Sequence, residues 1–415
     1  MYRINKEKII MFISFILIVI IFYNTPGVGD VEIWKEWMDY ANENGLKVGY
    51  AMQNDMYPPF ALFIQIIIRK YFVHLSNFTI LRIVNLAFLL ISVSIIYVLY
   101  KDIKVTVLSF SGLILSTNLG YLDIEMVPFI VLSIFFFSKG KLLYSSFFFT
   151  ILCLIKFQPL IILPYFMAYF ISIWDWEQKR VKILIKWRDI IRILMPPLII
   201  GGCTLLFYRK AFIEALYRAI FKSGSSISPN GLNFGWILQY ILQIKNPYKY
   251  GPLDQGKISI IWNAQQEDLR FRYIFIIILF ITLLTIVTSK NKSYKNILKC
   301  AIAGYTGYFL YNSGVHENHL FLGMVLMILL YLEEATKKNY YRMILYIISF
   351  NINLLSLYGL SGYGMGFDRA IGNKVDPTLF VAIYNVVILT YIIIEFVYEV
   401  LKDNKSNLLD EHDIQ

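Results

Sequence analysis

Apolar segments that could cross a lipid bilayer recur along almost the whole of this 415-residue chain, of which 58% is hydrophobic and 16% charged. A hydrocarbon core about 30 Å thick selects helices of about 20 residues, because a helix satisfies its own backbone hydrogen bonds there. About twelve segments approach that length. The sequence therefore predicts an all-α polytopic membrane protein. The segments lie near residues 9–23, 80–100, 104–118, 126–138, 142–156, 158–173, 190–208, 271–288, 297–312, 319–332, 342–359 and 378–400.

Positive charge predicts the orientation of these segments. If the N-terminus is cytoplasmic, most lysines and arginines of the short connections fall on the cytoplasmic side, including the cluster from Lys179 to Arg192. The short connections on the opposite side hold Lys156, Arg369 and Lys374. By the positive-inside rule, both termini are expected in the cytoplasm. The net charge of +11 then indicates contact with anionic lipid rather than nucleic acid. Frequent use of Ile, Asn and Lys indicates an AT-rich genome. We therefore expect a bacterial plasma membrane rather than an endoplasmic reticulum.

The pattern predicts one membrane-embedded domain, 1–415, made of a core over 1–335 and further transmembrane helices over 336–415. The first segment resembles a secretory signal, but the sequence Asn24-Thr25-Pro26-Gly27 after it lacks a small-x-small cleavage site. We therefore expect a retained anchor. Two long outer connections, 24–79 and 209–270, are rich in aromatic residues and amphipathic stretches, which predicts helices lying in the membrane interface.

Acids, imidazoles and a cation gather in four connections on the predicted outer side. Each has a structural explanation, because a carboxylate at a helix start caps backbone N–H groups and a lysine can extend its amine to the interface. Capping gives no reason for all of them to share one side, so we predict a polar cavity there. The residues are Asp30 and Glu32, Asp123 and Glu125, Lys156 and Gln158, and His316, Glu317 and His319.

Five outer segments carry short motifs in a fixed order. They read Asp30-Val31-Glu32 with Tyr57-Pro58-Pro59, Asn118-Leu119-Gly120-Tyr121-Leu122-Asp123-Ile124, Lys156-Phe157-Gln158-Pro159, Ser228-Pro229-Asn230-Gly231-Leu232-Asn233-Phe234-Gly235-Trp236, and Val315-His316-Glu317-Asn318-His319. Together they resemble motifs of the polyprenyl-phosphate-sugar-dependent glycosyltransferases of the GT-C superfamily. The last segment is similar to one in dolichyl-phosphate-glucose transferases and in bacterial mannosyltransferases related to the GPI mannosyltransferases. Tyr121 departs from the pattern, because glutamine is common there.

The resemblance implies a GT-C catalytic core over 1–335 and an inverting transfer of one hexose from a polyprenyl-phosphate carrier to a hydroxyl on the outer face. The acceptor is a glycolipid, a cell-surface polysaccharide or a protein, and the sequence does not distinguish these or identify the sugar. The resemblance also implies that Asp30 is the general base and that Glu32 orients Asp30 or the acceptor.

Further residues are expected to bind substrate. Fixed cations would stabilise the phosphate charge that develops during transfer. The candidate cations are Lys156, His316, Arg82 and Arg369. The other candidates are Asp123, Glu125, Gln158 and Glu317, with Tyr57 and Trp236, and also Trp34 and Trp37, as rings that could stack on a sugar.

Two questions remain open at the level of sequence. The acids Asp30, Glu32, Asp123 and Glu125 with His316 could hold a divalent ion, but one phosphate charge can be met by Lys, Arg and His, so we expect no obligatory metal. A lipid-linked sugar flippase or a polysaccharide polymerase or ligase is the alternative. A transporter would need polar groups near the bilayer midplane, and a diphosphate-dependent polymerase would favour arginine-rich outer loops.

Overall fold

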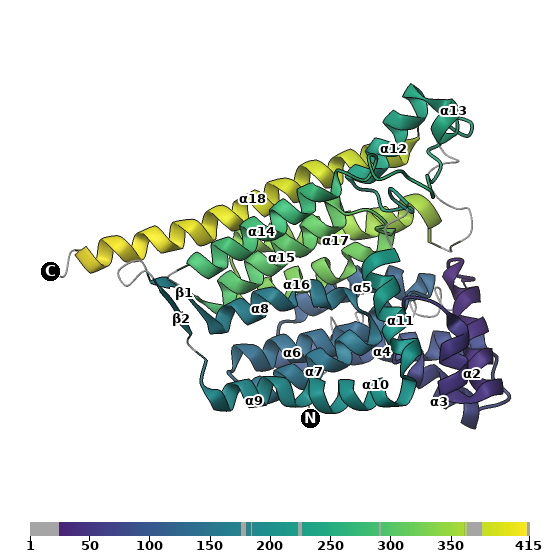
Figure 1. Ribbon diagram of the computed structural model, residues 1–415, viewed down its shortest axis with the longest axis horizontal. Coiled ribbons are helices and arrows are strands. Elements are labelled where there is room, and N and C mark those ends of the chain that lie inside the picture. The colour runs from purple at the N-terminus through teal and green to yellow at the C-terminus, as the bar shows by residue number, and fades with distance from the viewer. Residues whose placement is uncertain are drawn as a thin grey trace, which may run out of the picture.

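The computed structural model describes residues 25–175, 180–183, 185–222, 226–289, 292–360, 362 and 376–412. Within these residues the fold is helical apart from one antiparallel pair of strands (Figure 1). The expected first segment, 9–23, and Arg369 and Lys374 lie outside the described residues. The long helices are α2 (Asp30–Gln53), α4 (Asn77–Tyr100), α5 (Ile103–Leu119), α6 (Val127–Ser138), α7 (Leu142–Ile155), α14 (Arg272–Thr288), α15 (Tyr294–Tyr311), α16 (Phe321–Glu333), α17 (Lys337–Tyr358) and α18 (Pro377–His412).

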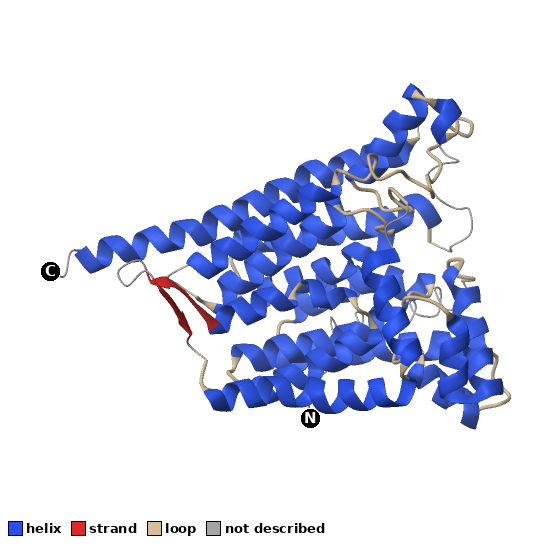
Figure 2. Ribbon diagram, viewed as in Figure 1, coloured by secondary structure: helices blue, strands red, loops and turns tan. Residues whose placement is uncertain are grey.

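Shorter elements complete the chain. They are α3 (Phe63–Tyr71), η1 (Leu122–Met126), η2 (Gln158–Ile161), α8 (Leu163–Phe170), β1 (Ile171–Asp175), β2 (Arg180–Ile183), α9 (Trp187–Pro196), η3 (Pro197–Gly201), α10 (Gly202–Tyr208), α11 (Lys210–Tyr217), η4 (Arg218–Lys222), α12 (Phe234–Lys245), α13 (Pro247–Tyr250) and η5 (Glu317–Leu320). Figure 2 shows how small a part the two strands form of this helical structure.

Three described helical segments are long and apolar enough to cross a membrane, which indicates a membrane protein. They span Asn77–Tyr100, Trp187–Tyr208 and Pro377–Asp403, with mean hydropathies of 2.4, 2.0 and 2.2. The second is continuous through α9, η3 and α10. Helices α5, α7 and α14 are equally apolar in character but shorter. The predicted helical class is therefore confirmed, and most of the predicted segments coincide with helices.

The segment predicted over 158–173 is different. Its helix, α8, has only eight residues and is followed by the hairpin of β1 and β2. Two prolines explain the late start of this helix. Pro159 lies in the turn η2, and Pro164 lies in the first turn of α8, where a missing N–H does no harm. The chain therefore turns at 158–161, and the helix begins at Leu163, five residues after the start of the predicted segment.

Helix α15 lies at the centre of the packing, and nearly all of its side chains are buried. Glycine allows its close contacts: a Cβ on Gly304 would lie 1.7 Å from the hydroxyl of Tyr165, and one on Gly307 would lie 2.7 Å from Ile278. Helices α14, α16 and α18 pack around α15, and α17 packs on α16 and α5. The C-terminal helices are thus part of the same bundle.

The long helices run side by side, so their connections gather at two ends (Figure 1). Helices α2, α3, α12 and α13 lie at one end, and the β-hairpin and the end of α18 lie at the other. Polar caps fix where several helices begin: Ser76 accepts from the Thr79 amide and Asp102 from the Val105 amide, both at 3.1 Å. The turns that carry the motifs meet at the end where α2 lies.

Candidate functional site

Hydrogen bonds from the loop before α2 fix the position of the start of this helix, and with it the position of Asp30. The Thr25 hydroxyl donates to the Asn118 side-chain oxygen at 2.6 Å, and the Val28 amide donates to the Leu119 carbonyl at 2.9 Å. The Arg82 guanidinium donates to the carbonyls of Thr25 and Asn118 from a buried position. These contacts tie the loop before α2 to the turn that carries Asp123.

Glycine is required where the turn after α5 meets the start of α2. Gly120 ends α5 with a φ of 87° and so adopts the left-handed conformation. A Cβ at this position would lie 2.5 Å from the side chain of Val31. The close approach sets α2 directly against the turn, one residue after Asp30.

Asp30 is the first residue of α2 and does not cap it. The N-cap position is Gly29, without a side-chain cap hydrogen bond. Among the described residues, no hydrogen bond or ion pair engages the Asp30 carboxylate, which is partly exposed. Burial and the neighbouring Glu317 raise the pKa of Asp30 to about 6, against the smaller opposing effects of His316 and Lys156. A carboxylate of this kind is suited to accept a proton near neutral pH.

A buried ion pair lies beside Asp30. Lys156 Nζ lies 2.8 Å from Asp123 Oδ1, and the two side chains are 7% and 2% exposed. Asn318 donates to the other oxygen of Asp123 at 2.9 Å. Lys156 directly follows α7, Asp123 belongs to η1, and Asn318 belongs to η5. Three separate connections therefore meet at one carboxylate.

Glu317 is held by two tyrosines. The hydroxyls of Tyr121 and Tyr358 both donate to its Oε1, the second at 3.0 Å. Its Oε2 is buried and makes no hydrogen bond with the part of the chain that the structure describes. Burial is the main cause that raises the pKa of Glu317. Asn230 reaches the Tyr358 hydroxyl at 3.4 Å, which links the 226–234 loop to this group.

His316 completes the group from the same segment. Part of its ring is open to solvent, yet the dense surroundings lower the pKa of His316 by desolvation, while Asp30 opposes that effect. The lowered pKa favours the neutral imidazole near pH 7. His316 and His319 have ring centroids 5.4 Å apart.

Two predicted residues pack beneath this group. The Tyr308 hydroxyl contacts His319 Nδ1 at 2.9 Å, and Gln158 lies next to that hydroxyl. Tyr57 packs edge-on against Trp34 and Trp37, with ring centroids 5.0 and 5.6 Å away. Both tryptophans are buried, so their rings support the site rather than line it. The Lys156 amine lies 5.7 Å from the centre of the Tyr57 ring.

Four other predicted residues lie outside this group. Glu32 is exposed and pairs with Lys35 at 2.6 Å. Nη1 and Nη2 of Arg82 donate to the backbone carbonyls of Asn118 and Thr25. The buried Trp236 donates from Nε1 to Thr378 at 2.8 Å. Glu125 is buried and accepts from Gln65, and its burial raises the pKa of its carboxyl well above the usual range.

The structure adds residues that the sequence did not single out for the site. Tyr121, Asn318 and Tyr358 contact the predicted acids directly, and Tyr358 comes from α17, beyond the predicted core of 1–335. In the described part of the chain, no three His, Cys, Asp or Glu side chains are grouped so as to hold a metal ion. No family model matches the chain, and no curated protein matches it significantly.

Proposed function

We propose that this protein is an integral-membrane glycosyltransferase that moves a hexose from a polyprenyl-phosphate carrier to a hydroxyl acceptor, with inversion, on the extracytoplasmic face. The observation that carries the proposal is Asp30, whose carboxylate has no hydrogen bond or ion pair with the described residues. It has a pKa of about 6 and lies next to a lysine and a histidine at one end of a helical membrane bundle. A base and cations close together are what this reaction needs.

The chemistry assigns separate tasks to these groups. The acceptor oxygen attacks the anomeric carbon, its proton passes to Asp30, and the bond from that carbon to the phosphate oxygen breaks. The carrier leaves as a phosphate anion, so the leaving group needs no general acid. The site must instead deprotonate the acceptor and stabilise growing negative charge on the phosphate.

Lys156 and His316 are the proposed phosphate contacts. Asp123 already offsets the charge of Lys156, so a bound phosphate would compete with Asp123 for the amine. The lowered pKa of His316 favours its neutral form, but a phosphate beside it would favour its protonated form. Binding of the donor would therefore add a positive charge where the transition state gains a negative one.

Glu317 is the proposed contact for sugar hydroxyls. Its Oε1 accepts from two tyrosines, which fixes the plane of the carboxyl group, and its Oε2 has no described partner. A buried acceptor of this kind is costly unless a ligand or water satisfies it. Gln158 and Tyr57 would support the same group of side chains from the η2 turn and the first outer loop.

The remaining parts of the proposal concern topology and partners. We place about twelve transmembrane helices in a plasma membrane, with both termini in the cytoplasm and α2, α3, α12 and α13 at the outer face. The bilayer, a lipid-linked sugar donor and a glycan, lipid or protein hydroxyl are the partners. No obligatory metal is proposed, and loss of transfer in EDTA with rescue by manganese would contradict that part.

A donor panel tests the function. Purified protein in lipid nanodiscs is given radiolabelled hexoses on polyprenyl monophosphate, on polyprenyl diphosphate and on a nucleotide, with membrane extract as acceptor. The proposal predicts transfer from a monophosphate donor alone. Transfer from the diphosphate donor would indicate a polymerase or ligase. No transfer from any donor, with donor translocation in liposomes, would indicate a flippase.

A further inference from the structure

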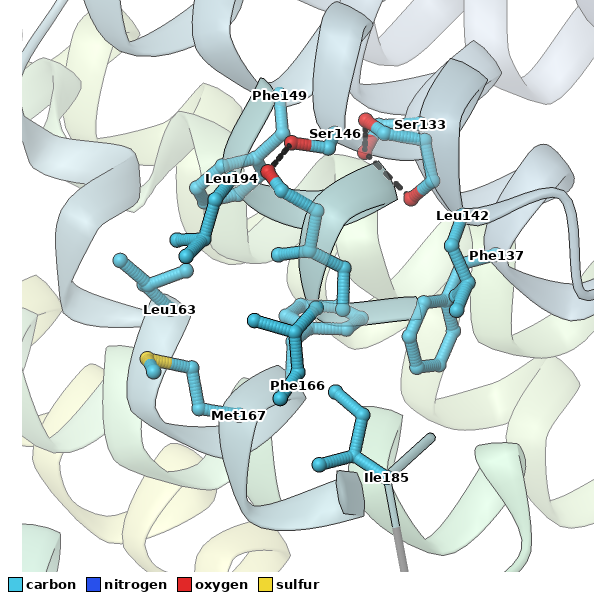
Figure 3. Close-up of a pocket in the computed structure, with 13 residues that line it drawn as sticks. Ser133, Phe137, Leu142, Ser146, Phe149, Leu163, Phe166, Met167, Ile185 and Leu194 are labelled. Carbon is cyan, nitrogen blue, oxygen red and sulfur yellow. Dashed lines mark hydrogen bonds between the residues drawn. The ribbon is translucent and has the colours of Figure 1, made fainter. Parts of the chain in front are cut away.

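A cavity of about 280 Å³ lies between α6, α7, α8 and α9. Figure 3 shows Phe149, Phe166 and other apolar side chains around it. The serines in its walls are engaged: Ser146 donates to the Ile193 carbonyl at 2.6 Å, and Ser133 donates to a backbone carbonyl of α7 at 3.0 Å. The walls therefore favour hydrocarbon over a polar ligand.

The cavity is distinct from the site of Asp30. Helix α7 begins at Leu142, which lines the cavity, and is followed by Lys156, which pairs with Asp123. At 1.5 Å per residue Leu142 lies about 21 Å from Lys156 along the helix, and Phe149, which also lines the cavity, lies about 10 Å from it. Phe137, near the C-terminal end of α6, also lines the cavity. The cavity therefore lies towards the end of the bundle opposite to the proposed catalytic site.

Two exposed lysines flank this cavity, one on each of two walls. Lys141 precedes α7, and the residues four and eight positions later, Ser145 and Phe149, line the cavity. Lys186 precedes α9, and Ile190 and Leu194 stand in the same relation to it. Lys141 directly precedes the lining residue Leu142, and Lys186 directly follows the lining residue Ile185, so both lysines adjoin the cavity wall.

The surroundings of α9 resemble a membrane interface. Trp187 follows Lys186 and is 70% exposed, as is common where a helix enters the headgroup region. The nearby acid, Asp189, is paired with Arg192 at 3.0 Å, so it does not offset Lys186. Helix α9 also begins the apolar span Trp187–Tyr208. The residues of this helix that face away from the bundle are largely exposed.

We propose that this cavity binds part of one acyl chain of an anionic phospholipid, whose phosphate lies between Lys141 and Lys186. The apolar walls accept the chain and the two lysines accept the charge. The volume is just below the range of about 300–1,000 Å³ for pockets that enclose a small ligand, which suits a segment of a chain. By the proposed orientation, the lipid belongs to the cytoplasmic leaflet.

Native mass spectrometry of the full chain in detergent, titrated with phosphatidylglycerol or phosphatidylcholine, tests the proposal. We expect wild type to bind one phosphatidylglycerol at least tenfold more tightly than phosphatidylcholine. The double variant Lys141→Gln/Lys186→Gln should lose that preference, since each lysine near a lipid phosphate contributes about fivefold. Lys104→Gln removes a charge from the first turn of α5, at the same end of the bundle, and should change nothing.

A second variant tests the cavity itself. Met167 lines it and is 51% exposed, so Met167→Trp can fill the space without burying a new side chain in the core. It should weaken binding of both lipids about tenfold, while Leu198→Trp on the exposed face of the Trp187–Tyr208 span should not. Equal binding of the two lipids by wild type, or unchanged binding by both site variants, would overturn the proposal. So would displacement of phosphatidylglycerol by equimolar polyprenyl phosphate.

Discussion

Variants of the Lys156–Asp123 pair distinguish its contribution to the free energy of unfolding from its role in transfer activity. At 2.8 Å and an effective dielectric constant of about 20, the attraction is about 6 kcal/mol, which the desolvation of two buried ions largely offsets. Removing one partner leaves an uncompensated buried charge. We therefore expect Lys156→Met or Asp123→Leu to lower the free energy of unfolding by about 3–5 kcal/mol.

The double variant should recover part of that loss. It removes both charges and leaves the Asn318 amide without its acceptor, which costs about 1–3 kcal/mol. Reversible unfolding in SDS, followed by tryptophan fluorescence, measures all three variants, with the exposed Lys210 of the Lys210–Glu214 pair as a control whose loss costs under about 1 kcal/mol. All three site variants should lack transfer activity. Single variants as stable as Lys210→Met, or a double variant with the summed loss, would refute the reasoning.

Three further predictions follow from other contacts. Because the pKa of Asp30 is about 6, the transfer rate should fall about tenfold between pH 7 and pH 5. In that range the folded state binds a proton at Asp30 more readily than the unfolded state does, so Asp30 stabilises the fold as the pH falls. Circular dichroism should therefore show no unfolding. Tyr358→Phe removes a 3.0 Å hydrogen bond to Glu317 and should lower kcat/KM about five- to thirty-fold, with unchanged thermal stability excluding a folding defect. Arg342 is 3% exposed and forms ion pairs with Glu395 and Glu399. Arg342→Met should lower the free energy of unfolding by about 3–5 kcal/mol. The protein that remains folded should keep normal specific transfer activity.

Much of the fold could be predicted because apolar length is a strong signal in a membrane chain. The exception at 158–173 arose where two prolines interrupt an apolar run, and hydropathy alone does not register that interruption. The pairing of the strands after α8 depends on backbone contacts that a short run of polar and apolar residues does not specify.

The charged residues of the candidate site could be predicted because charge is rare in an apolar chain. Its other residues were harder to predict. Asp30, Asp123, Lys156 and His316 were identified because polar residues at one side of a membrane need a reason. Glu32 was grouped with Asp30 by sequence, yet two residues of α-helix turn a side chain by about 200°, and Glu32 lies on the exposed face. Tyr358 was missed because a tyrosine in an apolar helix looks like any packing residue.

The most direct test of the central claim is single-turnover transfer from a polyprenyl-monophosphate hexose by wild type, Asp30→Asn and the control Glu43→Gln, which changes an exposed acid later in α2. We predict that Asp30→Asn binds the donor normally but loses at least about a thousandfold in transfer rate, with Glu43→Gln unchanged. Transfer by Asp30→Asn at the wild-type rate would contradict the assignment of Asp30 as the base.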